Sequence, residues 1–186
     1  MISRALAAIV QTIAADDPAV REQILEILGP IADDAHAAVE ATLEDVLSAQ
    51  VWGTKVHKAF ENLVDEMADQ IAEVLGEGFN IHTEESIEKG RSPRIGKDGS
   101  IDWEPRGTPN TIRPDVIVTQ LIDGVETLVL IVDLKTGKAG ISKAWARSLR
   151  DIFSIPGEKL GDPIQELRPS LPRPTQVYDE EKILWQ

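Results

Sequence analysis

The chain has 186 residues, of which 42% are apolar and 27% are charged, so it is long enough for one ordinary globular domain with a buried core. This composition excludes a wholly disordered or fibrous protein. No apolar run approaches the roughly 20 residues that cross a bilayer, and the N-terminus lacks the features of a signal peptide. We therefore expect no membrane span and a cytoplasmic site of action. A specialised secretion system would deliver the protein into a target cell. The absence of cysteine excludes disulfides, thiolate zinc sites and cysteine nucleophiles.

The net charge of −13, taken alone, argues against nucleic acid as a partner. The charge is, however, unevenly distributed. Residues 1–50 have a net charge of −7, whereas residues 134–150 contain no acidic side chain. We expect one locally positive face there, formed by Lys135, Lys138, Lys143, Arg147 and Arg150.

The first fifty residues predict helices only. Apolar residues recur at helical spacing in residues 2–13, and a second helix begins at Asp17-Pro18. We expect that helix to stop at Gly29-Pro30 and a third to follow, with Val39, Leu43, Val46 and Leu47 on its apolar face. Residues 1–50 thus form a helical N-terminal extension. Three roles stay open for it: to form a homodimer, to dock a delivery protein, or to shield the basic groove by mimicking nucleic acid.

Helical and strand periodicities alternate after residue 50, which indicates an α/β core over residues 51–186. We expect a helix over 51–75, strands over 79–87, 112–121 and 126–133, and a helix over 141–153. The segment 88–110 reads as a hairpin or a long irregular loop, and Asp123-Gly124 as a hairpin turn. The proline-rich tail from residue 155 should be extended, with a short strand over 182–185.

Two aspartates belong to the predicted strands: Asp115 within TIRPDVIVTQL, and Asp133 at the end of TLVLIVDLKTG. A buried aspartate is unfavourable unless it is hydrogen-bonded, paired or bound to a cation. Strand alternation places Asp133 and Lys135 on the same face. Converging oxygen ligands of this kind suit Mg²⁺ or Mn²⁺.

The helix over 51–75 supplies two further candidates. In GTKVHKAFE, His57 and Glu61 are four residues apart and therefore lie on one helical face. That face lies beside the apolar stripe, so an imidazole and a carboxylate would point towards the two aspartates.

These motifs resemble those of a known family. Asp115, preceded by Pro114, together with Asp133-Leu134-Lys135 resembles the PD-(D/E)xK motif of the restriction-endonuclease-like nucleases. The GxxxHxxxE pattern of Gly53, His57 and Glu61, and the sequence DLKTG, are similar to the RecB-type branch. The resemblance implies a mixed sheet flanked by helices and a metal-dependent hydrolysis of phosphodiester bonds, with DNA favoured over RNA as the substrate.

The resemblance also implies roles for these residues. Asp115, Asp133 and the carbonyl of Leu134 would bind Mg²⁺ or Mn²⁺, with His57 and Glu61 binding or bordering the metal. Lys135 would orient or help to deprotonate the attacking water. The nucleic-acid backbone would be followed by Lys138, Lys143, Arg147 and Arg150.

The biological setting that we favour is an antibacterial toxin domain with a cognate immunity protein. The chain lacks a clear QxxxY pair after the lysine motif and the four cysteines of an iron–sulfur cluster, both of which mark helicase-linked relatives. Two alternatives stay open. One is a phage or repair exonuclease that acts on DNA ends, and the other is a non-catalytic, acidic interaction protein.

In that last case the candidate residues are structural. His57 is then a core histidine, Asp115 pairs with Arg113 or Arg106, and Asp133 caps a turn. Glu84 and Glu85 would either supplement a metal site or form an exposed acidic edge. We expect the remaining chemically versatile side chains to be structural, with His36 and His82 on the surface and Trp103 and Trp145 in packing roles.

Overall fold

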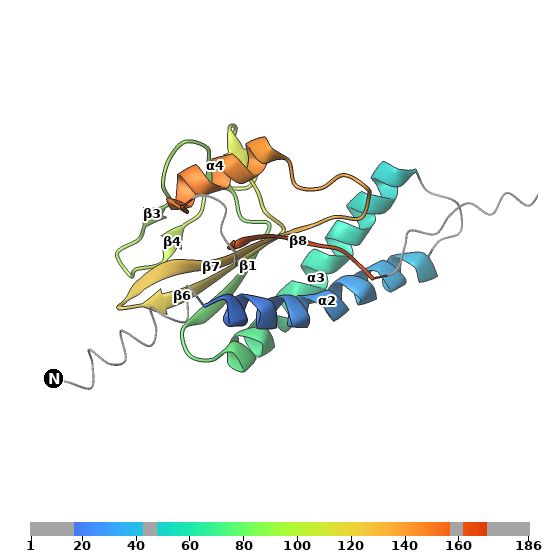
Figure 1. Cartoon of the computed structure of the whole chain (residues 1–186), viewed down its shortest axis with the longest axis horizontal. Helices are drawn as coiled ribbons and strands as arrows, with labels where there is room; N and C mark the ends of the chain where they lie inside the picture. The colour runs from blue at the N-terminus through green and yellow to red at the C-terminus, as the bar shows by residue number, and fades with distance from the viewer. Residues whose placement is uncertain (1–16, 43–47, 157–161, 171–186) are drawn as a thin grey trace, which may run out of the picture.

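The computed structural model describes residues 17–42, 48–156 and 162–170, and Figure 1 shows their arrangement. Three helices surround a four-stranded mixed sheet in this part of the chain. The helices are α2 (Pro18–Ala41), α3 (Ala49–Leu75) and α4 (Lys143–Phe153). The sheet contains β1 (Phe79–Thr83), β6 (Val116–Ile122), β7 (Val125–Leu134) and β8 (Ile164–Leu167). The architecture is therefore α/β, as predicted.

The sheet has the order β1-β6-β7-β8, with antiparallel pairs except for the parallel pair β7-β8. Asp123 and Gly124 form the β6-β7 turn with φ angles of 51° and 79°, the left-handed conformations that a two-residue hairpin requires. The predicted hairpin is confirmed. A bulge interrupts the pairing where Val118 faces Leu130 but Thr119 faces Leu128, which leaves Val129 without a partner in the register.

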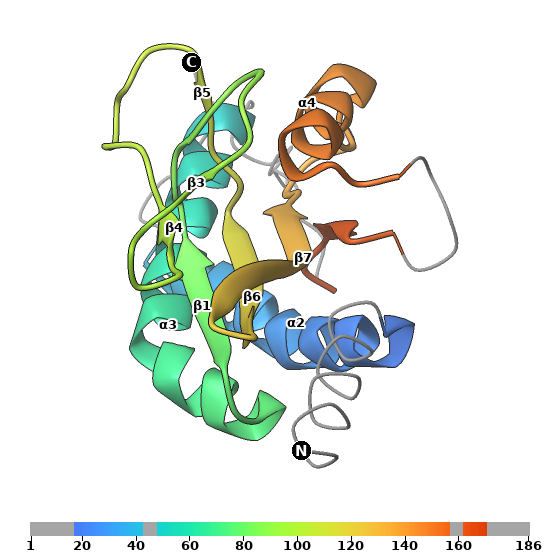
Figure 2. The same cartoon turned by 90° about the vertical axis from the view of Figure 1, so that its left-hand side faces the viewer.

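Each face of the sheet is covered. Helices α2 and α3 pack on one face around Leu28, Phe60 and Leu130, and α4 packs on the other through Leu149 and Ile152. Figure 2 shows the sheet between these layers. Strand β7 is buried on both sides along Val129–Leu134, because its alternating side chains enter the two cores in turn.

The segment that joins β1 to β6 crosses the second face as an arm, which we define as residues 84–113. It contains two short antiparallel pairs, β2-β5 and β3-β4. Their bounds are β2 (Ile87–Glu88), β3 (Arg94–Ile95), β4 (Ile101–Asp102) and β5 (Thr111–Ile112). The predicted strand over 79–87 is therefore too long, and it ends at Thr83 because Glu84 adopts a φ of 52°.

Helix α2 is continuous through Pro30, so the predicted break at Gly29-Pro30 is wrong. A proline inside a helix removes one hydrogen bond and usually kinks or breaks it. Here the apolar face formed by Ile24, Leu28, Ile31 and Ala35 is buried without interruption against α3 and the sheet. Tertiary packing thus outweighs the local preference of proline.

Arg21 fixes α2 to the sheet. Its side chain is buried, and its Nε donates to the carbonyl oxygen of Val129 over 2.9 Å. Val129 is the bulged residue of β7, so the guanidinium satisfies a carbonyl at the site where the ladder is interrupted. Helix α2 consequently shares one core with α3 and the sheet, and the domain boundary after residue 50 stays a prediction.

His36 and His82 were predicted on the surface, and both predictions are wrong. His36 is 2% exposed and packs edge-on against the Trp52 ring, with a centroid distance of 5.0 Å. Its α2 position faces α3, and the apolar stripe continues around it. His82 is half-buried and binds Glu126, whose carboxylate forms part of a network described below.

Two further predictions concern the ends of the chain. The parallel strand β8 was not predicted, since its four residues lie in a proline-rich tail and depend on pairing with β7. The helix predicted in residues 2–13, the residues Leu43, Val46 and Leu47, and the strand predicted over 182–185 lie outside the described residues. Among the described helices, none has the length and hydropathy of a membrane span.

Candidate active site

Six ionisable side chains gather at one end of the sheet. Strands β1 and β7 both run antiparallel to β6, so their carboxyl ends meet where β6 begins. The register places Thr83 beside Val116 and Val116 beside Val132. The residues that follow or precede these positions therefore come together, and α3 crosses the same end. The six are His57, Glu61, Glu84, Asp115, Asp133 and Lys135.

Asp115 lies at the centre of this group and is 7% exposed. Its Oδ1 lies 2.8 Å from Nδ1 of His57, and its Oδ2 accepts a hydrogen bond of 2.6 Å from the backbone N–H of Leu134. Leu134 thus enters the site through its N–H, whereas the resemblance implied a role for its carbonyl. The hydrogen bond to Asp115 is the main reason why the pKa of His57 is raised above its usual value.

Asp133, near the end of β7, forms an ion pair with Lys135, which directly follows the strand. Burial raises the pKa of Asp133, and the negative charge of Asp115 raises it further, although the hydrogen bond from Lys135 opposes both effects. The negative charge of Asp115 therefore makes ionisation of Asp133 less favourable, and positive charge close to Asp133 favours its ionised form.

Glu61 and Glu84 extend the group towards the arm. Burial raises the pKa of Glu84, an effect that Arg113 opposes and that the charges of Asp115 and Glu61 reinforce. Arg113 Nε lies 2.5 Å from Glu84 Oε2. The guanidinium of Arg106 lies 3.7 Å from a carboxylate oxygen of both Glu61 and Glu84. We refer to Glu61, Glu84, Asp115 and Asp133 as the carboxylate cluster.

The partner of the two arginines differs from the one predicted for a structural role of Asp115. That prediction paired Arg113 or Arg106 with Asp115, but both arginines contact Glu84. The sequence predicted that Glu84 would either supplement a metal site or form an exposed acidic edge, and its side chain is only 16% exposed. The one sequence signal for it was its place directly after an alternating strand, because such a residue lies at the sheet end where the neighbouring strand begins.

Gly53 connects α3 to the segment after Lys135. A Cβ atom at Gly53 would lie 2.9 Å from Oγ1 of Thr136, closer than real Cβ contacts allow. The glycine therefore lets the first turns of α3 approach the end of β7. This close approach brings the GxxxHxxxE and DLKTG motifs together in space.

The predicted nucleic-acid contacts lie on the loop after β7 and on α4. Lys138, Lys143 and Arg147 are exposed. Arg150 differs, since it forms an ion pair with Asp162 and its side chain is only 16% exposed. The loop that carries Lys138 is held by Arg168, whose guanidinium donates to the carbonyl oxygens of Gly137 and Ala139.

The donor set of the carboxylate cluster suits a hard divalent cation, because it consists of carboxylates with one imidazole beside them. The positions of these atoms are set by protein contacts: Asp115 faces His57 and Leu134, and one oxygen of Asp133 faces Lys135. Within the described ranges, no group of three acidic or histidine side chains already converges on one point. Side-chain rotations would be needed to gather the ligands.

Comparison with protein-family models, with curated proteins and with solved structures finds no match for this chain.

Proposed function

We propose that the protein is a nuclease that uses Mg²⁺ or Mn²⁺ to hydrolyse phosphodiester bonds, with DNA as the favoured substrate. The observation that carries this proposal is the meeting of Asp115, Asp133, Lys135 and His57 at one end of the sheet. His57 belongs to α3 and Asp133 to β7, whereas Asp115 directly precedes β6 and Lys135 directly follows β7. A mixed sheet with helices on both faces also supports a restriction-endonuclease-like core.

The pKa directions support a requirement for a cation. The pKa values of Asp133 and Glu84 are both raised, in part by the charge of Asp115 between them. Structural carboxylates usually have partners that lower the pKa, and raised values in a polar cluster are typical of functional sites. A divalent cation bound by these carboxylates would relieve the repulsion, acidify a bound water and offset charge on the phosphate.

The protein's own side chains have separate roles in this scheme. Lys135 holds a proton on its Nζ next to Asp133, where it would orient the attacking water and stabilise negative charge as the phosphorus is attacked. His57 would fix Asp115 in one rotamer through the 2.8 Å contact. Arg106 is 61% exposed and would exchange its weak contacts with Glu61 and Glu84 for a phosphate oxygen.

The exposed basic side chains would bind the nucleic-acid backbone. Lys138, Lys143 and Arg147 lie on the segment that leaves the site along α4, whereas Arg150 is engaged with Asp162. The resemblance supports the cytoplasm of a target cell as the place of action and a cognate immunity protein as a partner.

The proposal is tested by incubating the protein with supercoiled plasmid, linear DNA and transfer RNA in Mg²⁺, in Mn²⁺ and in EDTA. We expect cleavage only with the metals. Lys135→Gln and Asp133→Asn should lower the rate by at least about a hundredfold, the usual effect of losing a group that assists proton transfer. Lys97→Gln and Asp69→Asn, at exposed positions away from the site, are the matched controls.

Two results would overturn this assignment. Metal-dependent cleavage that survives both site substitutions would move the chemistry elsewhere in the chain. Inactivity of the wild-type protein on all three polymers, with no effect of the metals on its melting temperature, would favour a non-catalytic interaction protein.

A further inference from the structure

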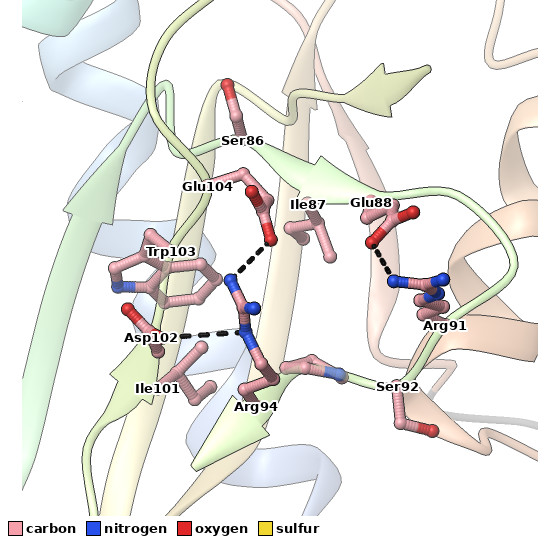
Figure 3. A pocket seen from close by; sticks show the side chains of 11 residues that line it. Ser86, Ile87, Glu88, Arg91, Ser92, Arg94, Ile101, Asp102, Trp103 and Glu104 are labelled. Atoms are coloured by element: carbon pink, nitrogen blue, oxygen red, sulfur yellow. Dashed lines mark hydrogen bonds and ion pairs between the residues drawn. The ribbon is translucent and has the colours of Figure 1, made fainter. Parts of the chain in front are cut away.

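The arm contains a hollow that the proposed chemistry does not use. It holds about 370 Å³ of empty space, a figure that includes the open solvent at its mouth. Figure 3 shows the Arg94 guanidinium in its centre, with the Trp103 ring on one side and the pair of Arg91 and Glu88 on the other. The hollow thus combines an aromatic ring with cationic and anionic groups.

The aromatic side of the hollow is held in place by a buried network. The rings of Trp103 and His82 have a centroid distance of 5.0 Å, and His82 Nε2 lies 2.6 Å from Glu126 Oε1. The other oxygen of Glu126 accepts a 2.6 Å hydrogen bond from the backbone N–H of Ile101, two residues before Trp103. Glu126 belongs to β7, so this network ties Trp103 to the central sheet.

The arginines of the hollow are held much less firmly. Arg91 and Arg94 have side chains that are 74% and 67% exposed. Arg91 contacts only Glu88 among the described ion pairs, at 3.1 Å, and Arg94 contacts Glu104 at 2.8 Å and Asp102 at 3.5 Å. Exposed ion pairs contribute little to stability. A ligand can therefore recruit these guanidinium groups at small cost.

The hollow adjoins the candidate active site. A backbone bridge joins Ser86 to Glu104, both of which line the hollow. Glu84 and Arg106, which contact each other at the site, lie two residues from the bridged pair on either strand. Two residues of extended chain span about 7 Å. A nucleotide next to the scissile phosphate would thus reach the hollow.

We propose that the hollow receives one unpaired guanine base of the substrate strand, adjacent to the bond that is cleaved. Guanine presents acceptors at O6 and N7, which the guanidinium of an arginine recognises, and an amino group that donates a hydrogen bond to a carboxylate. Arg94 with Glu104 supplies both patterns, and Trp103 supplies a stacking surface. This inference rests on the proposed nuclease function and adds a base preference to it.

The test measures binding without cleavage. Fluorescence anisotropy in EDTA compares a short labelled oligodeoxythymidine that has a single central guanine with the all-thymine oligonucleotide. We expect the guanine oligonucleotide to bind about tenfold more tightly, the effect of one well-formed arginine–guanine contact. Arg94→Gln should abolish this preference. Arg147→Gln should weaken the binding of both oligonucleotides equally and leave the preference for guanine unchanged.

Trp103→Leu should weaken the binding of the guanine oligonucleotide by about tenfold, because the stacking surface is lost. Because that change also removes packing against His82, Arg94→Gln, at an exposed position, keeps the test independent of folding. Equal binding of the two oligonucleotides by the wild-type protein, or a preference that survives Arg94→Gln, would overturn the inference. Cleavage without guanine preference would reject the hollow alone, and guanine preference without any cleavage in metal would reject the nuclease proposal alone.

Discussion

Glu126 offers a test of the network that supports Trp103, through the change Glu126→Gln. Its side chain is 3% exposed. Burial alone would raise its pKa, but hydrogen bonds from His82, from the N–H of Ile101 and from Thr119 outweigh burial and lower the pKa from 4.5 to about 2. Each unit corresponds to about 1.4 kcal/mol, so the ionised carboxylate stabilises the folded protein by roughly 3 kcal/mol at neutral pH.

The sign of the pH dependence follows from the lowered pKa. A group that is more acidic in the folded state stabilises that state above its unfolded pKa of 4.5, and this contribution is lost as the pH falls towards 2. Glutamine does not titrate, and its amide nitrogen would face a donor. We therefore expect Glu126→Gln to lower the free energy of unfolding by roughly 3 kcal/mol at pH near 7, and by progressively less below pH about 4.5.

Urea denaturation of both proteins across this pH range measures the difference, with Glu73→Gln on the exposed side of α3 as the matched control. The control should show the same acid dependence as the wild-type protein. A Glu126→Gln variant that loses stability in parallel with the wild type on acidification would refute the reasoning, because the pH-dependent contribution would then come from other groups.

Three more predictions concern the site and its support. Gly53→Ala should place a Cβ atom against Thr136 and lower any metal-dependent activity. Adding Thr136→Ala removes the hydroxyl that this Cβ would meet and should restore the activity, and a double-mutant cycle measures this coupling. Arg21→Met should lower the free energy of unfolding, measured by urea denaturation, by about 1–3 kcal/mol, because the carbonyl of Val129 loses a buried donor. An unchanged urea midpoint would contradict this prediction. Asp133→Asn should leave the metal-free melting temperature unchanged or higher, since burial disfavours the charged form, and should abolish the increase that Mn²⁺ causes in the wild type. A full Mn²⁺ response in that variant would exclude Asp133 as a ligand.

Long periodic elements and strong turn signals could be predicted from the sequence. The apolar spacing of α3 and α4 and the Asp123-Gly124 turn report local preferences that the fold keeps. The continuity of α2 through Pro30 and the strand β8 could not be predicted, since both depend on contacts with distant residues. Local signals favoured a helix break at Pro30 and an irregular tail where β8 forms.

The candidate site divides in the same way. His57, Asp115, Asp133 and Lys135 could be singled out because each is an ionisable residue within an apolar, periodic segment. Glu84 could be named only with two alternatives, a metal-site supplement or an exposed edge, because its placement depends on the antiparallel register of β1 with β6 and on a turn with positive φ. The contacts of Arg106 follow from the path of the arm, which no local pattern encodes.

Isothermal titration of Mn²⁺ into the metal-free protein tests the central claim most directly, because it needs no knowledge of the substrate. We expect saturable binding to the wild-type protein and to Asp69→Asn, and an affinity lower by at least about tenfold for Asp115→Asn, whose carboxylate lies between His57 and the end of β7. The account would be contradicted if the wild-type protein bound no Mn²⁺, or if Asp115→Asn bound it as tightly as the wild type.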